Sequence, residues 1–198
     1  EKRRLSRREM QTLEAADLEG ENRRAQLARD VFVFAFYAGG MRFGDLCRLK
    51  PDHIKSDGDA VRLQYRMMKT GQPVDLPLPR PAQAIMQRWA DHAGPYLFPI
   101  LTHERTDPEV LRRRISSRNV QLNRALKRAV KAAGIDNPDS VTMHVARHSF
   151  ADFARTKTSD LYAVSKALGH SSLKITENYL SEFDREATDQ LASDMWGE

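Results

Sequence analysis

The chain of 198 residues has little cysteine and no long apolar run, and each absence excludes a class of protein. Its one cysteine, Cys47, excludes an internal disulfide and a cysteine-based zinc cluster. The longest uninterrupted apolar run, Val31–Ala38, falls far short of the roughly 20 residues that span a membrane. No secretory hydrophobic region follows the N-terminus. We therefore expect no membrane partner and a reducing, cytoplasmic location at the nucleoid.

The sequence also lacks an initiator methionine, so we expect a fragment or a processed product. Its net charge is +5, and that charge is uneven. The stretch 111–131 holds eight Lys or Arg and no acid, whereas 182–198 holds six acids and one Arg. A basic body with an acidic tail is typical of a protein that binds a polyanion.

Hydrophobic periodicity predicts a mainly α fold with a small three-stranded antiparallel β-sheet. Ser6 and Glu9 have the spacing of a capping box, and three prolines confine the third strand to a sheet edge. We expect strands over 53–55, 60–67 and 74–78. The expected helices cover 7–18, 23–38, 43–49, 81–92, 108–133, 145–156, 161–168 and 173–180, with one more from Asp184 onward.

Four short segments carry side chains suited to phosphate chemistry: 38–46 with Arg42, 69–71 with Lys69, 142–150 with His144 and Arg147, and 168–172 followed by Tyr179. Taken singly, each also fits a solvated side chain on the surface or ordinary packing in the core.

In this order, the four segments resemble the tyrosine recombinases, or phage integrase family. Gly40-Met41-Arg42-Phe43-Gly44-Asp45-Leu46 is similar to the family's G-[LM]-R-x-x-E-L box. The segment from His144 to Ala151 is similar to H-x-L-R-H-[ST]-F-A, and 168–172 is similar to L-G-H-x-S. Tyr179 falls where the family keeps its nucleophile. The departures are mild: Asp45 stands where Glu is usual, and Ala146 replaces a larger apolar residue.

The resemblance implies the fold of the family's catalytic domain over 1–181 and a C-terminal amphipathic helix over 182–198. We expect the family's N-terminal core-binding domain to be absent from this chain. The implied activity is that of a site-specific recombinase or integrase. A tyrosine attacks a phosphodiester of double-stranded DNA, and strands are exchanged and rejoined without ATP, cofactor or metal.

The same resemblance assigns catalytic roles, which the residue chemistry supports. Two guanidiniums, from Arg42 and Arg147, suit the non-bridging phosphate oxygens because arginine stays charged and pairs bidentately. Lys69 is the candidate general acid for the leaving 5′-hydroxyl. His144 and His170 serve proton movement and hydrogen bonding, in roles that could be exchanged between them.

Two other polar residues and the basic stretch have supporting roles. We read Asp45 as a carboxylate that orients a neighbouring cationic or imidazole side chain, and His148 as a buried structural histidine. Four arginines at the start of the stretch are predicted to contact DNA phosphates: Arg112, Arg113, Arg114 and Arg118. A solvated face is the alternative. On that helix we expect the packed side to hold Val120, Leu122, Ala125 and Leu126.

The acidic tail carries an apolar residue every fourth position, at Phe183, Ala187, Leu191 and Met195. An amphipathic helix must bury such a stripe. We expect it to dock on a neighbouring protomer, so that the protein is a monomer when free and a tetramer on DNA. Docking within the same chain is the alternative.

Competing functions are type IB topoisomerase-like relaxation, a DNA-binding module without activity, and a metal-dependent nuclease. The last lacks a carboxylate cluster.

Overall fold

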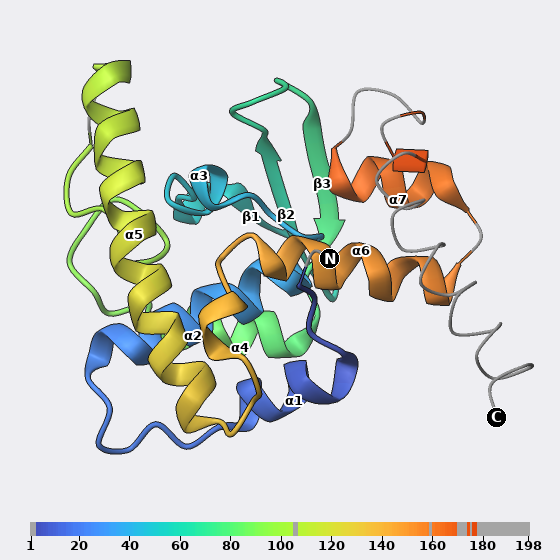
Figure 1. Cartoon of the computed structure of the whole chain (residues 1–198). Helices are drawn as coiled ribbons and strands as arrows, with labels where there is room; N and C mark the ends of the chain where they lie inside the picture. Colours follow the sequence, from blue (N-terminus) through green and yellow to red (C-terminus); the bar gives the residue numbers. More distant parts are fainter. Residues whose placement is uncertain (1–2, 105–106, 159, 170–173, 175, 178–198) are drawn as a thin grey trace, which may run out of the picture.

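The computed structural model describes residues 3–104, 107–158, 160–169, 174 and 176–177, and these form a helical body with one small sheet at its side (Figure 1). The helices are α1 (Arg7–Ala15), α2 (Arg23–Tyr37), α3 (Phe43–Leu46), α4 (Arg80–Arg88), α5 (Pro108–Ala132), α6 (Val145–Lys157) and α7 (Leu161–Leu168). There are also two 3₁₀ turns, η1 (Pro51–His53) and η2 (Pro138–Ser140). The mainly α prediction is confirmed, but 178–180 and the helix expected from Asp184 lie outside the described residues.

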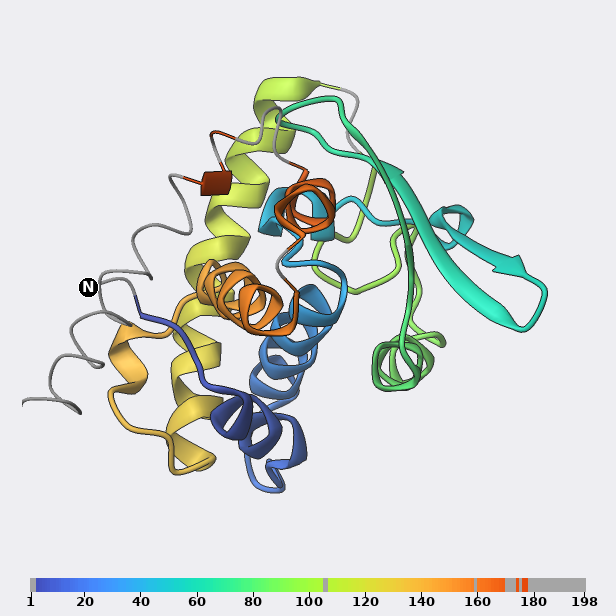
Figure 2. The same cartoon turned by 90° about the vertical axis from the view of Figure 1, so that its right-hand side faces the viewer.

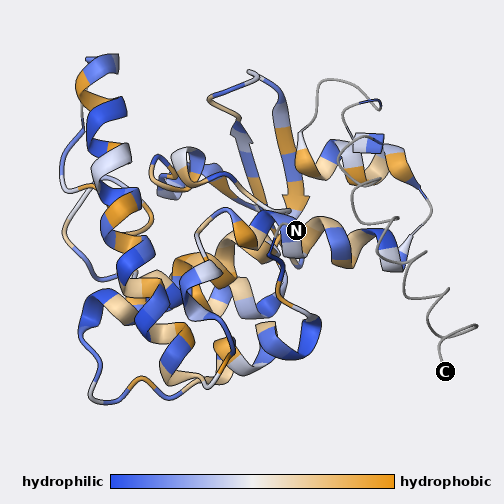
Figure 3. Ribbon diagram, viewed as in Figure 1, coloured by the Kyte–Doolittle hydropathy of each residue, from blue (hydrophilic) through white to orange (hydrophobic). Residues whose placement is uncertain are grey.

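Helix α2 is the centre of the core. It packs against α1, α4, α5 and α6, and its residues Val31, Phe32, Val33 and Phe34 are fully buried. The ring of Phe34 meets that of Phe98 edge to face at 4.9 Å between centroids. This packing explains the all-round apolar character of the second half of α2 (Figure 3).

Local signals fix the start of several elements. The predicted capping box at Ser6 is present: its hydroxyl accepts the Glu9 N–H at 3.2 Å, and Glu9 Oε2 accepts the Ser6 N–H at 2.8 Å. Helix α5 begins after Asp107, whose carboxylate accepts the N–H groups of Glu109 and Val110. These bonds satisfy amides that a helix leaves unpaired in its first turn.

The sheet has the order β1-β2-β3 and is antiparallel throughout. Its strands are β1 (Ile54–Asp57), β2 (Ala60–Arg66) and β3 (Pro73–Pro77). Leu63 of β2 lies between Ile54 and Leu76 in register and is fully buried, so this row of side chains joins the sheet to the body. β3 is an edge strand, as its prolines predicted.

One expectation for α5 is wrong. Leu122, Ala125 and Leu126 are buried as predicted, but Val120 is 51% exposed. Val120 precedes Leu122 by two residues, which is about 200° around the helix, so it points away from the core.

The N-terminal end of α5 and the β2–β3 hairpin reach the same end of the molecule, at the top of Figures 1 and 2. Within the described part of the chain, no helix is long and apolar enough to cross a membrane.

Candidate active site

The predicted site residues lie on four segments that are far apart in sequence. Arg42 occupies the N-cap position of α3, Lys69 lies in the turn between β2 and β3, and His144 is the N-cap of α6. Arg147 lies in the first turn of α6. His170 and Tyr179 fall outside the described residues.

Arg147 joins two of these segments through its guanidinium. It is 2% exposed, and it donates from Nη1 to the Gly40 carbonyl at 2.9 Å and from Nη2 to the Leu168 carbonyl at 2.6 Å. Gly40 lies just after the end of α2, and Leu168 is the last residue of α7. The side chain therefore has a fixed orientation between the loop that carries Arg42 and the chain that leads to His170.

Gly40 makes this arrangement possible. Its φ is +69°, in the left-handed region that favours glycine. A Cβ added there would lie 3.2 Å from the Cα and Cγ of Arg147 and from Cδ1 of Phe150. The glycine thus lets the end of α2 approach the backbone of α6 closely enough for its carbonyl to accept from Arg147.

Arg42 and Asp45 both contact the chain next to Lys69. Arg42 is half-buried, and its Nη1 donates to the Met67 Sδ at 3.1 Å. Asp45 is 5% exposed, and its Oδ1 accepts the Met68 N–H at 2.7 Å. Asp45 therefore holds a backbone amide of the hairpin, and its role in orienting a cationic or imidazole side chain stays a prediction.

The second carboxylate oxygen of Asp45, Oδ2, is buried without a hydrogen-bond partner among the described residues. Burial raises the pKa of Asp45 above its ordinary value, and the Met68 amide and the charges of Arg42, Arg48 and Arg147 partly offset this effect. The charges of both arginines that are predicted to bind the phosphate, Arg42 and Arg147, thus lower the pKa of Asp45.

Lys69 is exposed on a tight turn. The turn is closed by the Met67 N–H, which donates to the Gln72 carbonyl at 3.0 Å, and by the Gly71 N–H, which donates to the Met67 carbonyl at 2.8 Å. The predicted place of Lys69 at a hairpin tip is confirmed.

The two histidines of α6 contact each other. The rings of His144 and His148 meet edge to face with 4.5 Å between centroids. His144 is exposed, whereas His148 is 7% exposed. The burial predicted for His148 is confirmed, and its ring supports that of the exposed histidine.

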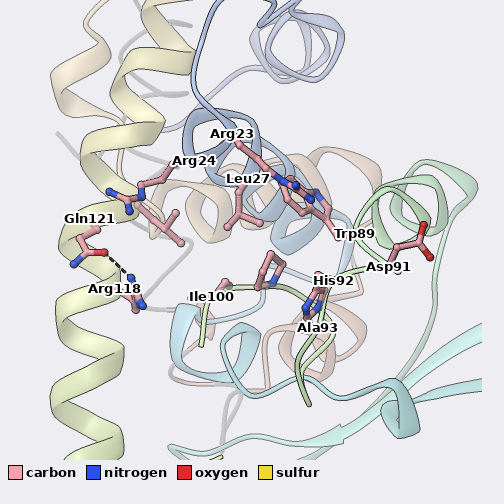
Figure 4. A pocket seen from close by; sticks show the side chains of 12 residues that line it. Arg23, Arg24, Leu27, Trp89, Asp91, His92, Ala93, Ile100, Arg118 and Gln121 are labelled. Atoms are coloured by element: carbon pink, nitrogen blue, oxygen red, sulfur yellow. Dashed lines mark hydrogen bonds between the residues drawn. The ribbon is translucent and has the colours of Figure 1, made fainter. Parts of the chain in front are cut away.

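The four arginines of α5 divide into two environments. Arg112, Arg113 and Arg114 are exposed on the first turns, where Arg113 lies 3.8 Å from Glu109. Arg118 is half-buried, donates to Oε1 of Gln121 at 2.9 Å, and lines a cavity of about 540 Å³ with Arg23 and Arg24 (Figure 4).

Met67 is the site residue that sequence reasoning missed. It is 2% exposed and lies between Arg42 and Gly169. Its one sequence signal is its place two residues before Lys69. Among the described residues no group of three His, Cys, Asp or Glu side chains could hold a metal ion.

Solved structures share this fold. The XerH site-specific recombinase bound to palindromic difH substrate, in a post-cleavage complex, aligns with a TM-score of 0.71 at 20% identity, covering 100% of this chain and 54% of that one. The XerA recombinase aligns with a TM-score of 0.62 at 22% identity, covering 99% of this chain and 66% of that one. The fold is that of the tyrosine recombinases.

Sequence comparison gives the family itself. The model of the phage integrase family matches residues 3–186. The tyrosine recombinase XerC of Bradyrhizobium diazoefficiens is 33% identical over 173 residues, which are 84% of this chain and 50% of the relative. The tyrosine recombinase XerA of Thermococcus kodakarensis is 31% identical over 153 residues, 75% of this chain and 49% of the relative. The chain belongs to the phage integrase family, and it spans about half the length of these relatives.

Proposed function

We propose that this chain is the catalytic part of a site-specific DNA recombinase that breaks and rejoins strands through Tyr179. The observation that carries the proposal is the convergence of Arg42, Asp45, the Lys69 hairpin and Arg147 around the end of α7. A direct hydrogen bond joins Arg147 to Gly40, 107 positions away, and the other three hydrogen bonds span 21 to 25 positions. Tyr179 follows α7 by eleven residues.

The proposed reaction exchanges one phosphodiester for another. The phenolic oxygen of Tyr179 forms a bond to the scissile phosphorus, and the bond from phosphorus to the 5′-oxygen breaks. The product is a 3′-phosphotyrosyl link and a free 5′-hydroxyl, which later attacks the link to rejoin a strand. Because bond energy is kept in the link, neither ATP nor water is consumed.

Two proton transfers balance this exchange. A free tyrosine has a pKa near 10, so its proton must pass to an acceptor as the bond forms. His144 or His170 takes that proton, and the other donates a hydrogen bond to a non-bridging oxygen. The ammonium of Lys69 gives a proton to the departing 5′-oxygen.

The guanidiniums of Arg42 and Arg147 pair with the non-bridging oxygens as their charge grows in the transition state. A donor held in place before the reaction is worth about 3–4 kcal/mol in comparable sites. The Gly40 and Leu168 carbonyls that accept from Arg147 supply that fixed orientation.

Arg112, Arg113, Arg114 and Arg118 are proposed to contact DNA phosphates. The first three are exposed on the end of α5 that reaches the same side of the molecule as the Lys69 hairpin (Figures 1 and 2). Each phosphate contact adds close to one unit to the slope of log affinity against log salt. We expect Arg112→Ala and Arg113→Ala each to lower that slope by about one unit. Arg128→Ala is the matched control, because Arg128 is exposed at the other end of the helix.

The acidic segment 182–198 is proposed to dock on a neighbouring protomer and to make a tetramer on DNA of a protein that is a monomer when free. Its acids and its apolar stripe, Phe183, Ala187, Leu191 and Met195, support this role. Sedimentation of a chain truncated after Ser181 tests it. Loss of the higher-order complex on DNA is expected, and an unchanged complex would favour docking within one chain. We also propose that the protein, as one that acts on DNA, works in the cytoplasm at the nucleoid.

A covalent capture experiment tests the activity and identifies the DNA site at the same time. The protein is incubated in EDTA with fragmented genomic DNA carrying nicks, denatured, and recovered with any strand attached to it. Sequencing the attached strands gives the site. We expect an adduct that survives EDTA and is lost in Tyr179→Phe. An adduct that requires a divalent metal would contradict the proposal. Relaxation of supercoiled plasmid lacking the recovered site would favour the topoisomerase-like alternative.

A further inference from the structure

Met67 lies where the three parts of the candidate site meet. It is the first residue after β2, it is 2% exposed, and it lies two positions before the exposed Lys69. Its backbone N–H and carbonyl make both hydrogen bonds that close the turn, to Gln72 and from Gly71. Its side chain leaves the hairpin and enters the body of the molecule.

The sulfur of Met67 binds the hairpin to Arg42. Nη1 of Arg42 donates to Sδ at 3.1 Å, and the hydroxyl of Thr70 donates to the same sulfur at 3.7 Å. A thioether is polarizable and accepts weakly, so the hairpin can be held against the Arg42 guanidinium without neutralising its charge. A carboxylate in this place would compete with a phosphate for Arg42.

The methyl end of Met67 fills the space next to Gly169. A Cβ added at Gly169 would overlap Sδ and Cε of Met67. Gly169 ends α7 in the left-handed conformation, with a φ of +60°, and His170 follows it in sequence. Met67 thus contacts the loop of Arg42 on one side and the chain leading to His170 on the other.

The neighbouring residue Met68 adds a second attachment. Its side chain is 51% exposed, its amide is held by Asp45, and its methyl group lies next to Gly44, where an added Cβ would be 2.8 Å from Cε. The hairpin that carries Lys69 is therefore attached to the body next to its tip through both methionines: Met68 on Asp45 and Gly44, and the Met67 side chain between Arg42 and Gly169.

We propose that Met67 is a positioning residue that holds the Lys69 hairpin in register with Arg42, so that the ammonium of Lys69 reaches the departing 5′-oxygen. This inference rests on the proposed function. Its consequence is specific: losing the Met67 side chain impairs protonation of the leaving group and leaves nucleophilic attack intact.

A change of leaving group separates these two effects. A DNA site whose scissile 5′-oxygen is replaced by sulfur releases a thiolate, which needs no proton because thiols have a pKa near 8.5. Attack by tyrosine and phosphate binding are unchanged. A variant that has lost only the general acid is therefore slow on the oxygen substrate and restored on the sulfur substrate.

The experiment measures the rate of covalent adduct formation on both substrates, built on the site recovered by covalent capture. Met67→Ala is expected to slow cleavage of the oxygen substrate by about 10- to 100-fold, the loss typical of a reacting group displaced by about 1 Å. On the sulfur substrate it is expected to match wild type. Lys69→Ala is the positive reference for this pattern, and Met10→Ala, at an equally buried methionine on α1, is the matched control that should leave both rates unchanged.

Met67→Leu keeps the side-chain volume and removes the sulfur, and it tests the inference even if Met67→Ala does not fold. It is expected to show the same substrate pattern with a smaller loss. If Met67→Leu loses the same factor in cleavage rate on both substrates while sulfur restores Lys69→Ala, the positioning role of Met67 is overturned. The proposed function is unaffected by that result. Absence of an adduct from wild-type protein, or its persistence in Tyr179→Phe, would overturn the proposed function and this inference with it.

Discussion

Replacing Gly40 by alanine tests the account of how Arg147 is held. The substitution acts in two ways, both visible in the structure. It puts a side chain on a residue with a φ of +69°. It also places a methyl group 3.2 Å from Cα and Cγ of Arg147 and from Cδ1 of Phe150.

The two effects have separate magnitudes. A non-glycine residue in the left-handed conformation costs about 1–2 kcal/mol. Forcing an extra methyl group into a closely packed place costs about 1–3 kcal/mol more. We therefore expect Gly40→Ala to lower the free energy of unfolding by about 2–5 kcal/mol.

Gly134→Ala is the matched control, because Gly134 also has a φ of +69° and nothing lies within 4 Å of an added Cβ. Only the cost of the left-handed backbone conformation applies there, so the free energy of unfolding is expected to fall by about 1–2 kcal/mol. Urea unfolding followed by circular dichroism gives both values. Adduct formation should fall in Gly40→Ala and stay unchanged in Gly134→Ala. Equal losses of stability, with equal activity, would refute the close approach of Gly40 to Arg147.

Three further predictions concern single groups. Burial raises the pKa of Asp45, so the stability that this group contributes in acid is lost as the pH rises through its folded-state pKa. The melting temperature of Asp45→Asn relative to wild type should therefore increase between about pH 4 and about pH 7, and a decrease would contradict the shift. Burial also raises the pKa of Cys47, which is 1% exposed. A thiol reagent at neutral pH should label the single cysteine in guanidinium and leave the native protein unlabelled; native labelling would show that the thiol is accessible. Ser6→Ala removes the capping box and should cost about 1 kcal/mol, or about 2–4 °C in melting temperature, whereas an unchanged midpoint would mean that the box contributes nothing.

The sequence predicted those features that depend on local chemistry. The capping box at Ser6, the three strands, the hairpin tip at Lys69 and the course of α5 all follow from residue spacing or turn residues a few positions apart. The burial of His148 and the edge position of β3 were predicted on the same basis.

Contacts between distant segments could not be predicted in this way. Arg147 donates to two backbone carbonyls, and a carbonyl has no sequence signature. Asp45 accepts an amide 23 positions away. Asp30, 1% exposed on α2, accepts from Arg88 and from the indole N–H of Trp89, although nothing in the α2 sequence marks it as the partner of α4. Val120 was misplaced because its apolar character alone does not give its direction.

The identity of the residue that becomes joined to DNA tests the central claim most directly. The chain has five tyrosines. Among those described, Tyr65 and Tyr96 are buried, Tyr37 is half-buried, and Tyr162 is 59% exposed. Tyr162 is thus the described tyrosine that is most open to an incoming phosphate, and Tyr162→Phe is the natural control.

The measurement is mass spectrometry of the captured adduct after digestion with nuclease and protease. The account predicts a nucleotide joined through its 3′-phosphate to the peptide that contains Tyr179, in wild type and in Tyr162→Phe alike. A nucleotide on Tyr162 or on any residue other than Tyr179 would contradict it.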